Sequence, residues 1–274
     1  MKNYILDERE KPTPALLQLL QLCEVPHENT LESIIVQTQI KWCQLGKERW
    51  ELEERYPEKK AEALTLLKKL GCIDAVHPSQ SHYTYGILLG ASRAGMQSRI
   101  ETLIEEWKKG VRFDTLILLT GKRPLTAWEN PTETLQTEAD LFLDLLEHAD
   151  LPQELKNSPR ILINTPMQIA KGGAVRRPNA ADTIMAWLDE YHPTPGPCLI
   201  FANQPFVGYF EAVFKIFLPD TFAYEVVGKK ANENAQLALF LDNLARWLYQ
   251  VSMALLHKSE KITTERTENT EMSK

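Results

Sequence analysis

The chain has 274 residues, enough for one large domain or for a domain with a helical extension. Its composition, 43% hydrophobic and 25% charged, is that of an ordinary soluble globular protein, and its formal net charge of −6 argues against a nucleic-acid partner. The four scattered cysteines form no Cys-x-x-Cys pair, which argues against a disulfide scaffold or a zinc ribbon. No signal peptide or membrane-spanning run is recognisable, so we expect a cytoplasmic, bacterial-type protein.

Residues 1–78 have the periodicity of helices. Leucines recur through 14–23, and apolar residues lie at roughly helical spacing in 30–45. Pro57 and Gly71 are placed to begin and to end a third helix. We expect these helices to pack on a larger domain, because their apolar faces need a partner.

Short apolar strands alternate with helical segments from 79 to 256. The predicted strands are 83–90, 114–120, 160–165, 197–202 and 222–227. The predicted helices are 95–109, 132–148, 179–191, 205–217 and 232–256. This alternation predicts an α/β fold, a Rossmann-like three-layer sandwich with a mainly parallel sheet. The polar segment 257–274 is expected to be disordered, because it has few apolar residues to bury.

The first predicted strand ends in small and basic residues. They are Gly90, Ser92, Arg93 and Arg99. Ligands bind just past the carboxyl ends of parallel strands, and a helix N-terminus attracts anions. A tight turn alone would explain the glycine, but the two arginines favour an anion or ligand site.

The second predicted strand ends in a similar group. It consists of Thr120, Gly121, Lys122 and Arg123. One such group is explained by a solvated loop, whereas two at neighbouring strand ends favour a phosphate or carboxylate ligand. Glu138 lies further on among several acids, most of which solvation explains. An acid that reaches a cleft containing arginines would act as a general base or bind a ribose hydroxyl.

The segment 171–183 joins a glycine pair to a run of polar residues. They are Gly172, Gly173, Arg176, Arg177, Asn179 and Asp182. The spacing of Asn179 and Asp182 is that of a helix cap, which accounts for these two residues without a ligand. The glycine pair beside two arginines predicts a flexible loop that closes on an anionic ligand.

The fourth predicted strand is followed by amide and aromatic side chains. Asn203 and Gln204 are candidates for orienting a polar edge of a ligand, and Phe206 and Tyr209 for stacking on a ring. A cap followed by core aromatics explains the same residues equally well. The six histidines lack metal-ligand spacing and no Gly-x-Ser-x-Gly elbow occurs, so neither a metal site nor a serine hydrolase is predicted.

In this order along the chain, the motifs resemble the DUF218 family of bacterial envelope proteins, of the SanA, ElyC and YdcF type. The resemblance runs from about Tyr83 to Gly228. It rests on Gly90, Arg99, Thr120-Gly121, Glu138-Ala139 and Asn179 to Thr183. It implies this fold and a pocket rather than a defined reaction.

The chain resembles a divergent member of that family. Phe206 and Tyr209 stand where the family has a histidine and an arginine. Proton transfer by that histidine would therefore be lost, while ligand binding would survive. The family is often tethered to a membrane, whereas no anchor is predicted here.

Two functional hypotheses follow. The first is a protein that binds a small anionic, nucleotide-like ligand at the strand carboxyl ends, either as an enzyme of hydrolase or transferase type or without catalysis. Its predicted binding residues are Gly90, Ser92, Arg93, Arg99, Thr120, Gly121, Arg123, Arg176, Arg177, Asn179, Asn203 and Gln204, and its predicted catalytic pair is Glu138 and Asp182. The alternative is a catalytically degenerate protein-interaction module, with Trp42 and Trp50 of the N-terminal helices as anchors. The sequence leaves any cofactor open.

Overall fold

The chain forms two compact units in the computed structural model, which describes residues 4–44, 46–47, 51–170 and 172–272, with side chains as far as Ser259. The first unit comprises Met1–Asp74, Gly208–Ile216 and Ala231–Lys274, and the second comprises Ala75–Val207 and Phe217–Lys230. The boundaries therefore differ from the predicted ones, because the last two helices group with the N-terminal helices rather than with the sheet.

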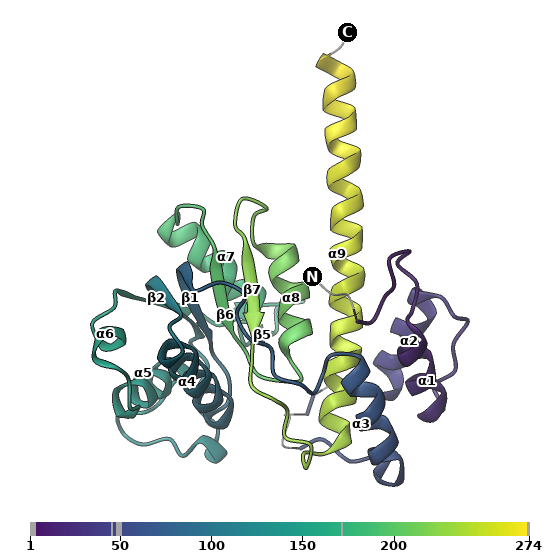
Figure 1. Cartoon of the computed structure of the whole chain (residues 1–274), viewed down its shortest axis with the longest axis horizontal. Helices are drawn as coiled ribbons and strands as arrows, with labels where there is room; N and C mark the ends of the chain where they lie inside the picture. Colours follow the sequence, from purple (N-terminus) through teal and green to yellow (C-terminus); the bar gives the residue numbers. More distant parts are fainter. Residues whose placement is uncertain (1–3, 45, 48–50, 171, 273–274) are drawn as a thin grey trace. The chain divides into compact units, whose positions relative to one another are not determined.

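The first unit is helical. Its elements are α1 (Pro14–Leu22), α2 (Leu31–Lys41), the 3-10 turn η1 (Pro57–Lys59), α3 (Lys60–Lys69), most of α8 (Val207–Phe217) and α9 (Leu237–Met272). α1 packs on α3, and both α2 and α3 pack on α9 (Figure 1). Gly208 leaves room for the Trp247 ring, which a Cβ at this position would strike.

The structure bears on the predicted tryptophan anchors and on the polar segment after residue 256. Trp42 is only 2% exposed and belongs to the helical core, so the prediction that it anchors a partner is wrong. Trp50 lies outside the described residues. Helix α9 runs to Met272 and so includes most of the polar segment for which we expected disorder. Among the described residues, no helix is both long and apolar enough to span a membrane.

The second unit contains the α/β sheet that the sequence predicts. Its strands are β1 (His82–Leu89), β2 (Arg112–Gly121), β3 (Arg160–Thr165), β6 (Cys198–Phe201) and β7 (Tyr224–Val227). They pair in parallel in the order β3-β2-β1-β6-β7 (Figure 1). All five strands fall within a few residues of the predicted ranges, because each contains a short run of apolar residues.

Helices cover both faces of this sheet. α4 (Arg93–Lys108) and α5 (Glu138–His148) pack on one face, in a core that includes Leu88 and Leu118. α7 (Ala180–Tyr191) packs on the other face, where Trp187 meets Tyr85 edge-on with ring centroids 5.2 Å apart. The smaller elements are η2 (Ala127–Glu129), α6 (Gln153–Lys156), β4 (Gln168–Ile169) and β5 (Val175–Arg176). The predicted fold class, a parallel sheet between helices, is confirmed.

Two segments of this unit differ in detail from the predictions. The helix expected from 132 begins at Glu138, because Thr137 caps it and pairs reciprocally with Asp140. Within the segment expected to be a flexible loop, Val175 and Arg176 form β5, which pairs with β4, and Asn179 caps α7; closure on a ligand stays a prediction. Gly172 and Gly173 have positive φ angles of 105° and 85°, which suits the tight turn of this hairpin.

Candidate functional site

The carboxyl ends of β1 and β2 meet at the first side chain of α5. Glu138 accepts a hydrogen bond at Oε2 from the Gly121 N–H, at 2.8 Å. A Cβ on Gly90 would lie 2.6 Å from the same oxygen, so the missing side chain at Gly90 is what lets the carboxylate settle there. Glu138 is only 7% exposed and lies at the edge where the sequence predicted a ligand pocket.

One arginine is bound by two buried carboxylates at this edge. Arg123 donates from Nε to Glu138 at 3.0 Å and from its two terminal nitrogens to Glu129 at 2.8 and 2.7 Å. The same guanidinium also donates to the Ala91 carbonyl at 2.8 Å. We call Arg123, Glu129 and Glu138 the carboxylate–arginine cluster. With both acids ionised, the cluster has a net charge of −1.

The two acids of the cluster have opposite pKa shifts. Burial raises the pKa of Glu129, but hydrogen bonds from Arg123 and Thr126 outweigh it and bring the value down to about 2. Burial also raises the pKa of Glu138, and there the Arg123 charge and the Gly121 N–H do not cancel the effect. The difference follows from geometry, because Glu129 takes the two-pronged contact with Arg123 and Glu138 takes a single one. Glu138 is therefore the member that gains a proton first.

Arg99 ties the ends of β1 and β6 together. It is 1% exposed, and one terminal nitrogen donates to the carbonyls of Leu89 at 2.7 Å and Gly90 at 2.9 Å. Its Nε donates to the Asn203 side-chain oxygen at 3.2 Å. These contacts make Arg99 and Asn203 positioning residues for the strand ends.

The N-terminus of α4 differs from those of its neighbours. Ser92 is its N-cap residue but makes no side-chain capping hydrogen bond, and the first turn contains no acid. α5 and α7 both begin with a complete capping box, Thr137 with Asp140 and Asn179 with Asp182. The first-turn N–H groups of α4 therefore have no carboxylate of their own helix beside them to offset the positive end of the helix dipole.

Arg93, the first residue of α4, joins this N-terminus to the cluster. Its Nε and one terminal nitrogen donate to the Glu129 carbonyl at 3.2 and 2.9 Å. Arg93 is partly exposed, whereas Arg123 and Arg99 are buried. Lys122, next to Gly121, is exposed.

The structure brings together one group of predicted site residues. Gly90, Arg93, Arg99, Gly121, Arg123, Glu138 and Asn203 all belong to the contacts described above. A separate group forms at the start of α7, where Arg176 binds Asp182 at 2.6 and 2.9 Å. Asp182 also accepts from the Asn179 N–H at 2.7 Å, so its partners lie at its own helix start. The two groups approach each other where the Pro178 ring fills the space beside Gly121.

The remaining predicted site residues belong to neither of these two groups. The Thr120 hydroxyl is buried and donates to the Ile163 carbonyl at 2.8 Å, so it braces β2 against β3. Gln204 is buried and its N–H donates to the Lys229 carbonyl at 3.2 Å, while Arg177 is exposed. Phe206 is 4% exposed, so core packing explains it better than ring stacking does. Tyr209 belongs to the first unit, where it packs beside the helical core.

Sequence reasoning missed Glu129, the acid most tightly bound to Arg123. Thr126 and Glu129 form a capping box around the short turn η2. The pattern Thr-x-x-Glu at 126–129 is a recognised signal for such a box. It was overlooked because the turn is only three residues long and falls inside a segment that lacks periodic apolar residues.

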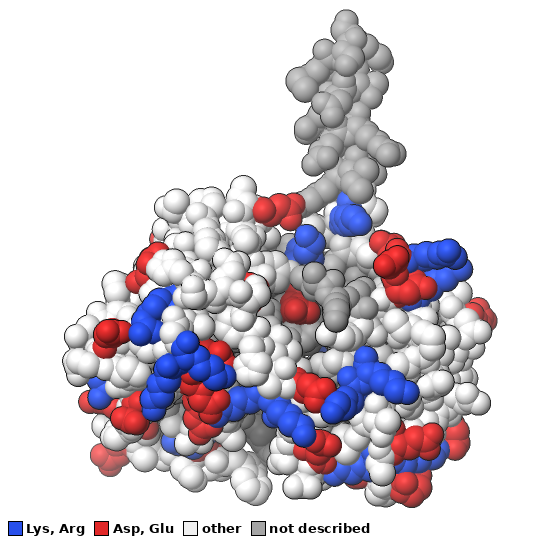
Figure 2. All heavy atoms as spheres, in the orientation of Figure 1, with Lys and Arg blue, Asp and Glu red and all other residues white. Residues whose placement is uncertain are grey.

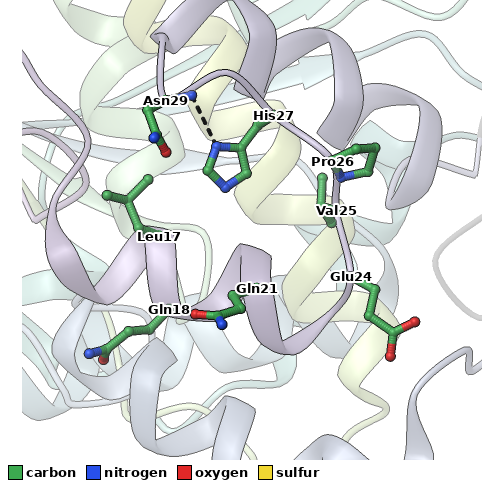
Figure 3. Close-up of a pocket in the computed structure, with 8 residues that line it drawn as sticks. All are labelled: Leu17, Gln18, Gln21, Glu24, Val25, Pro26, His27 and Asn29. Atoms are coloured by element: carbon green, nitrogen blue, oxygen red, sulfur yellow. Dashed lines mark hydrogen bonds between the residues drawn. The ribbon is translucent and has the colours of Figure 1, made fainter.

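The first unit has a hollow of a different character. It has a volume of about 530 Å³ and lies between α1 and the segment Glu24–Asn29. Figure 3 shows Leu17, Gln21 and His27 around it, and His27 Nδ1 accepts a hydrogen bond from the Asn29 N–H at 3.1 Å. No lysine or arginine is among its lining residues. The hollow therefore does not match the anionic ligand that the sequence predicts.

The surface charge is mixed. On the face that Figure 2 shows, the coloured basic and acidic side chains are interspersed rather than gathered into one basic field. Among the described residues, no group of three or more His, Cys, Asp and Glu side chains is arranged to hold a metal ion. A family-model scan and a search of curated proteins both gave no match to this chain. The resemblance to the DUF218 family therefore stays a prediction.

Proposed function

We propose that the second unit binds a small anionic, nucleotide-like ligand at the carboxyl ends of β1 and β2, with a phosphate group at the N-terminus of α4. The observation that carries the proposal is the contrast in capping. Two helices at this edge supply a carboxylate to their own first turns, and α4 does not. Free first-turn N–H groups directly after a glycine-ended strand favour an anion.

The charges around this N-terminus support the same conclusion. Arg93, the first residue of α4, is partly exposed and so accessible to an anion, and Lys122 is exposed at the end of β2. The cluster beside this N-terminus has a net charge of −1 with both acids ionised, and burial, by raising the pKa of Glu138, favours the form in which that charge is lost. A neutral cluster does not repel a phosphate, whereas a cluster with two ionised acids does.

Glu138 is the candidate acid or base if the protein catalyses hydrolysis or group transfer. Its raised pKa and its place beside Gly90 and Gly121 suit proton transfer at the strand ends. Asp182 is a weaker candidate, because its carboxylate is engaged by Arg176 and by the cap of α7.

A divergent relationship to the DUF218 family is part of this proposal. Gly90, Arg99, Gly121 and Glu138 carried the resemblance in the sequence, and they lie in one connected set of contacts. This arrangement supports a shared binding edge. It leaves the reaction open.

The proposal is tested by calorimetric titration of the full chain with inorganic phosphate, pyrophosphate and ADP. We expect saturable binding of pyrophosphate and ADP that weakens as salt is added. A ligand at 100 times its dissociation constant would stabilise the fold by about 2.7 kcal/mol, which a thermal-shift measurement detects. If neither pyrophosphate nor ADP produces heat or a thermal shift, the proposal is wrong.

A matched pair of variants locates the binding. Arg93→Ala removes a cation from the first residue of α4, and Lys108→Ala removes one from its last residue. We expect Arg93→Ala to weaken pyrophosphate binding and Lys108→Ala to leave it unchanged. Equal effects of the two substitutions would show that net charge, rather than this helix N-terminus, attracts the anion.

A further inference from the structure

Trp128 is an exposed aromatic side chain at the same edge of the sheet. It is 77% exposed, whereas the other described tryptophans, Trp42, Trp107, Trp187 and Trp247, are all buried. A single exposed apolar side chain is common on protein surfaces, so what matters for function is where Trp128 lies. Neither the fold nor the proposed anion site has so far accounted for it.

The backbone around Trp128 is fixed by its neighbours. The Thr126 N–H and hydroxyl both donate to the Glu129 carboxylate, at 3.0 and 3.1 Å, and the Glu129 N–H donates to the Thr126 carbonyl at 2.9 Å. Arg123 holds the same carboxylate from the other side. Trp128 therefore stands on a short turn whose residues on both sides are bound to the buried cluster.

The same contacts place this turn beside the start of α4. Glu129, the residue after Trp128, accepts at its carbonyl from Arg93, the first residue of α4. The Glu129 carboxylate and the Ala91 carbonyl bind the same nitrogen of Arg123, at 2.7 and 2.8 Å. Trp128 is therefore the neighbour of Glu129 in the chain. Glu129 contacts Arg93 directly, and it is joined through Arg123 to Ala91 in the loop before α4.

We propose that Trp128 stacks on a planar ring of the bound ligand, so that the ligand is a nucleotide rather than a simple phosphate or sugar phosphate. The inference rests on the proposed function, which supplies the phosphate position. An indole offers a large, rigid face at low entropic cost, and stacking on a nucleobase does not depend on which base is present. Trp128 thereby provides ring binding without selecting among bases.

The test compares ADP with pyrophosphate on the full chain and three variants. Trp128→Ala removes the ring, Trp128→Phe keeps a smaller one, and Tyr249→Ala removes an exposed aromatic side chain from α9 as a control. We expect Trp128→Ala to weaken ADP binding by about tenfold or more, with pyrophosphate affinity unchanged. Trp128→Phe should retain most of the ADP affinity, and Tyr249→Ala should match the wild type. ADP should also quench tryptophan fluorescence in the wild type and not in Trp128→Ala.

The outcomes separate the two proposals. If pyrophosphate binds and Trp128→Ala leaves ADP affinity unchanged, the stacking inference is wrong while the anion site stands. If Trp128→Ala weakens both ligands equally, Trp128 supports the turn rather than the ring, and the inference is again overturned. If the wild type binds neither ligand, both proposals fail together.

Discussion

The N-termini of α4, α5 and α7 lie at the same edge of the sheet and differ in how they are capped. α5 and α7 each place an aspartate on their own first turn, through Asp140 and Asp182. α4 has neither a side-chain cap nor a first-turn acid. A helix that supplies its own carboxylate has already offset its positive end, and of these three helices α4 is the one without such a carboxylate.

The largest expected effect comes from the cluster that holds this edge together. Arg123→Ala would leave two buried carboxylates without their shared cation, and we expect a loss of about 3–5 kcal/mol in the free energy of unfolding. Arg176→Ala breaks a more exposed ion pair at the start of α7 and should cost about 0–1 kcal/mol. Urea denaturation of the two variants measures the difference. Similar losses would mean that the buried cluster contributes no more than a surface pair.

The acids of the cluster should respond to pH in opposite directions. The folded pKa of Glu129 is lowered to about 2 from its ordinary 4.5, so its contribution to stability is complete above pH 4.5 and is lost as the pH falls toward 2. The folded pKa of Glu138 is raised, so its contribution is complete below pH 4.5 and is lost as the pH rises through the raised value.

Two variants isolate these contributions. The stability advantage of the wild type over Glu129→Gln should shrink between pH 4.5 and 2. The wild type should lose stability relative to Glu138→Gln as the pH rises above 4.5. Unfolding curves recorded across this range provide the measurement. A parallel pH dependence of the two differences would contradict the assignment of the proton to Glu138.

The close approach of Glu138 to β1 predicts a smaller effect at Gly90. A Cβ at this position would lie 2.6 Å from Glu138 Oε2, so Gly90→Ala should cost about 1–3 kcal/mol. In a Glu138→Ala background the contact is gone, and the same substitution should cost less. A double-mutant cycle measures the coupling, and strictly additive losses would show that the carboxylate is not what requires a glycine.

The smallest effects test the three helix N-termini directly. Thr137→Ala and Asn179→Ala each remove a cap that accepts a backbone N–H and should cost about 1 kcal/mol. Ser92→Ala removes a hydroxyl that makes no capping hydrogen bond, so its cost should be close to zero. Denaturation of the three variants ranks them. A loss at Ser92 equal to the other two would show that α4 is capped after all.

The sheet could be predicted from the sequence because its signal is local. Runs such as Ile87–Leu89 and Leu116–Leu119 are apolar throughout and end at glycine or polar residues, as strands covered on both faces do. The grouping of α8 and α9 with the N-terminal helices could not be predicted in the same way. It depends on contacts between segments far apart in the chain, such as the Trp247 ring over Gly208.

The sequence predicted which residues meet at the candidate site better than it predicted what each of them binds. Gly90, Gly121, Arg123 and Glu138 do meet at the strand ends, as the parallel topology requires. Their partners could not be read from the sequence, since an arginine that binds an anion and one that binds a buried glutamate look alike there. The contact with Glu129 shows that Arg123 binds buried glutamates. This contact depends on the folded turn η2, which brings Glu129 to Arg123.

The most direct test of the account places a charge at the open N-terminus of α4. Ala94 is exposed on its first turn, and Ala94→Asp and Ala94→Asn are nearly the same shape but differ in charge. The measurement is pyrophosphate affinity together with unfolding free energy for both variants. We predict that Ala94→Asp abolishes binding while stabilising the unliganded protein by about 0.3–1 kcal/mol, and that Ala94→Asn keeps binding. Undiminished binding in Ala94→Asp would contradict an anion site at this helix N-terminus.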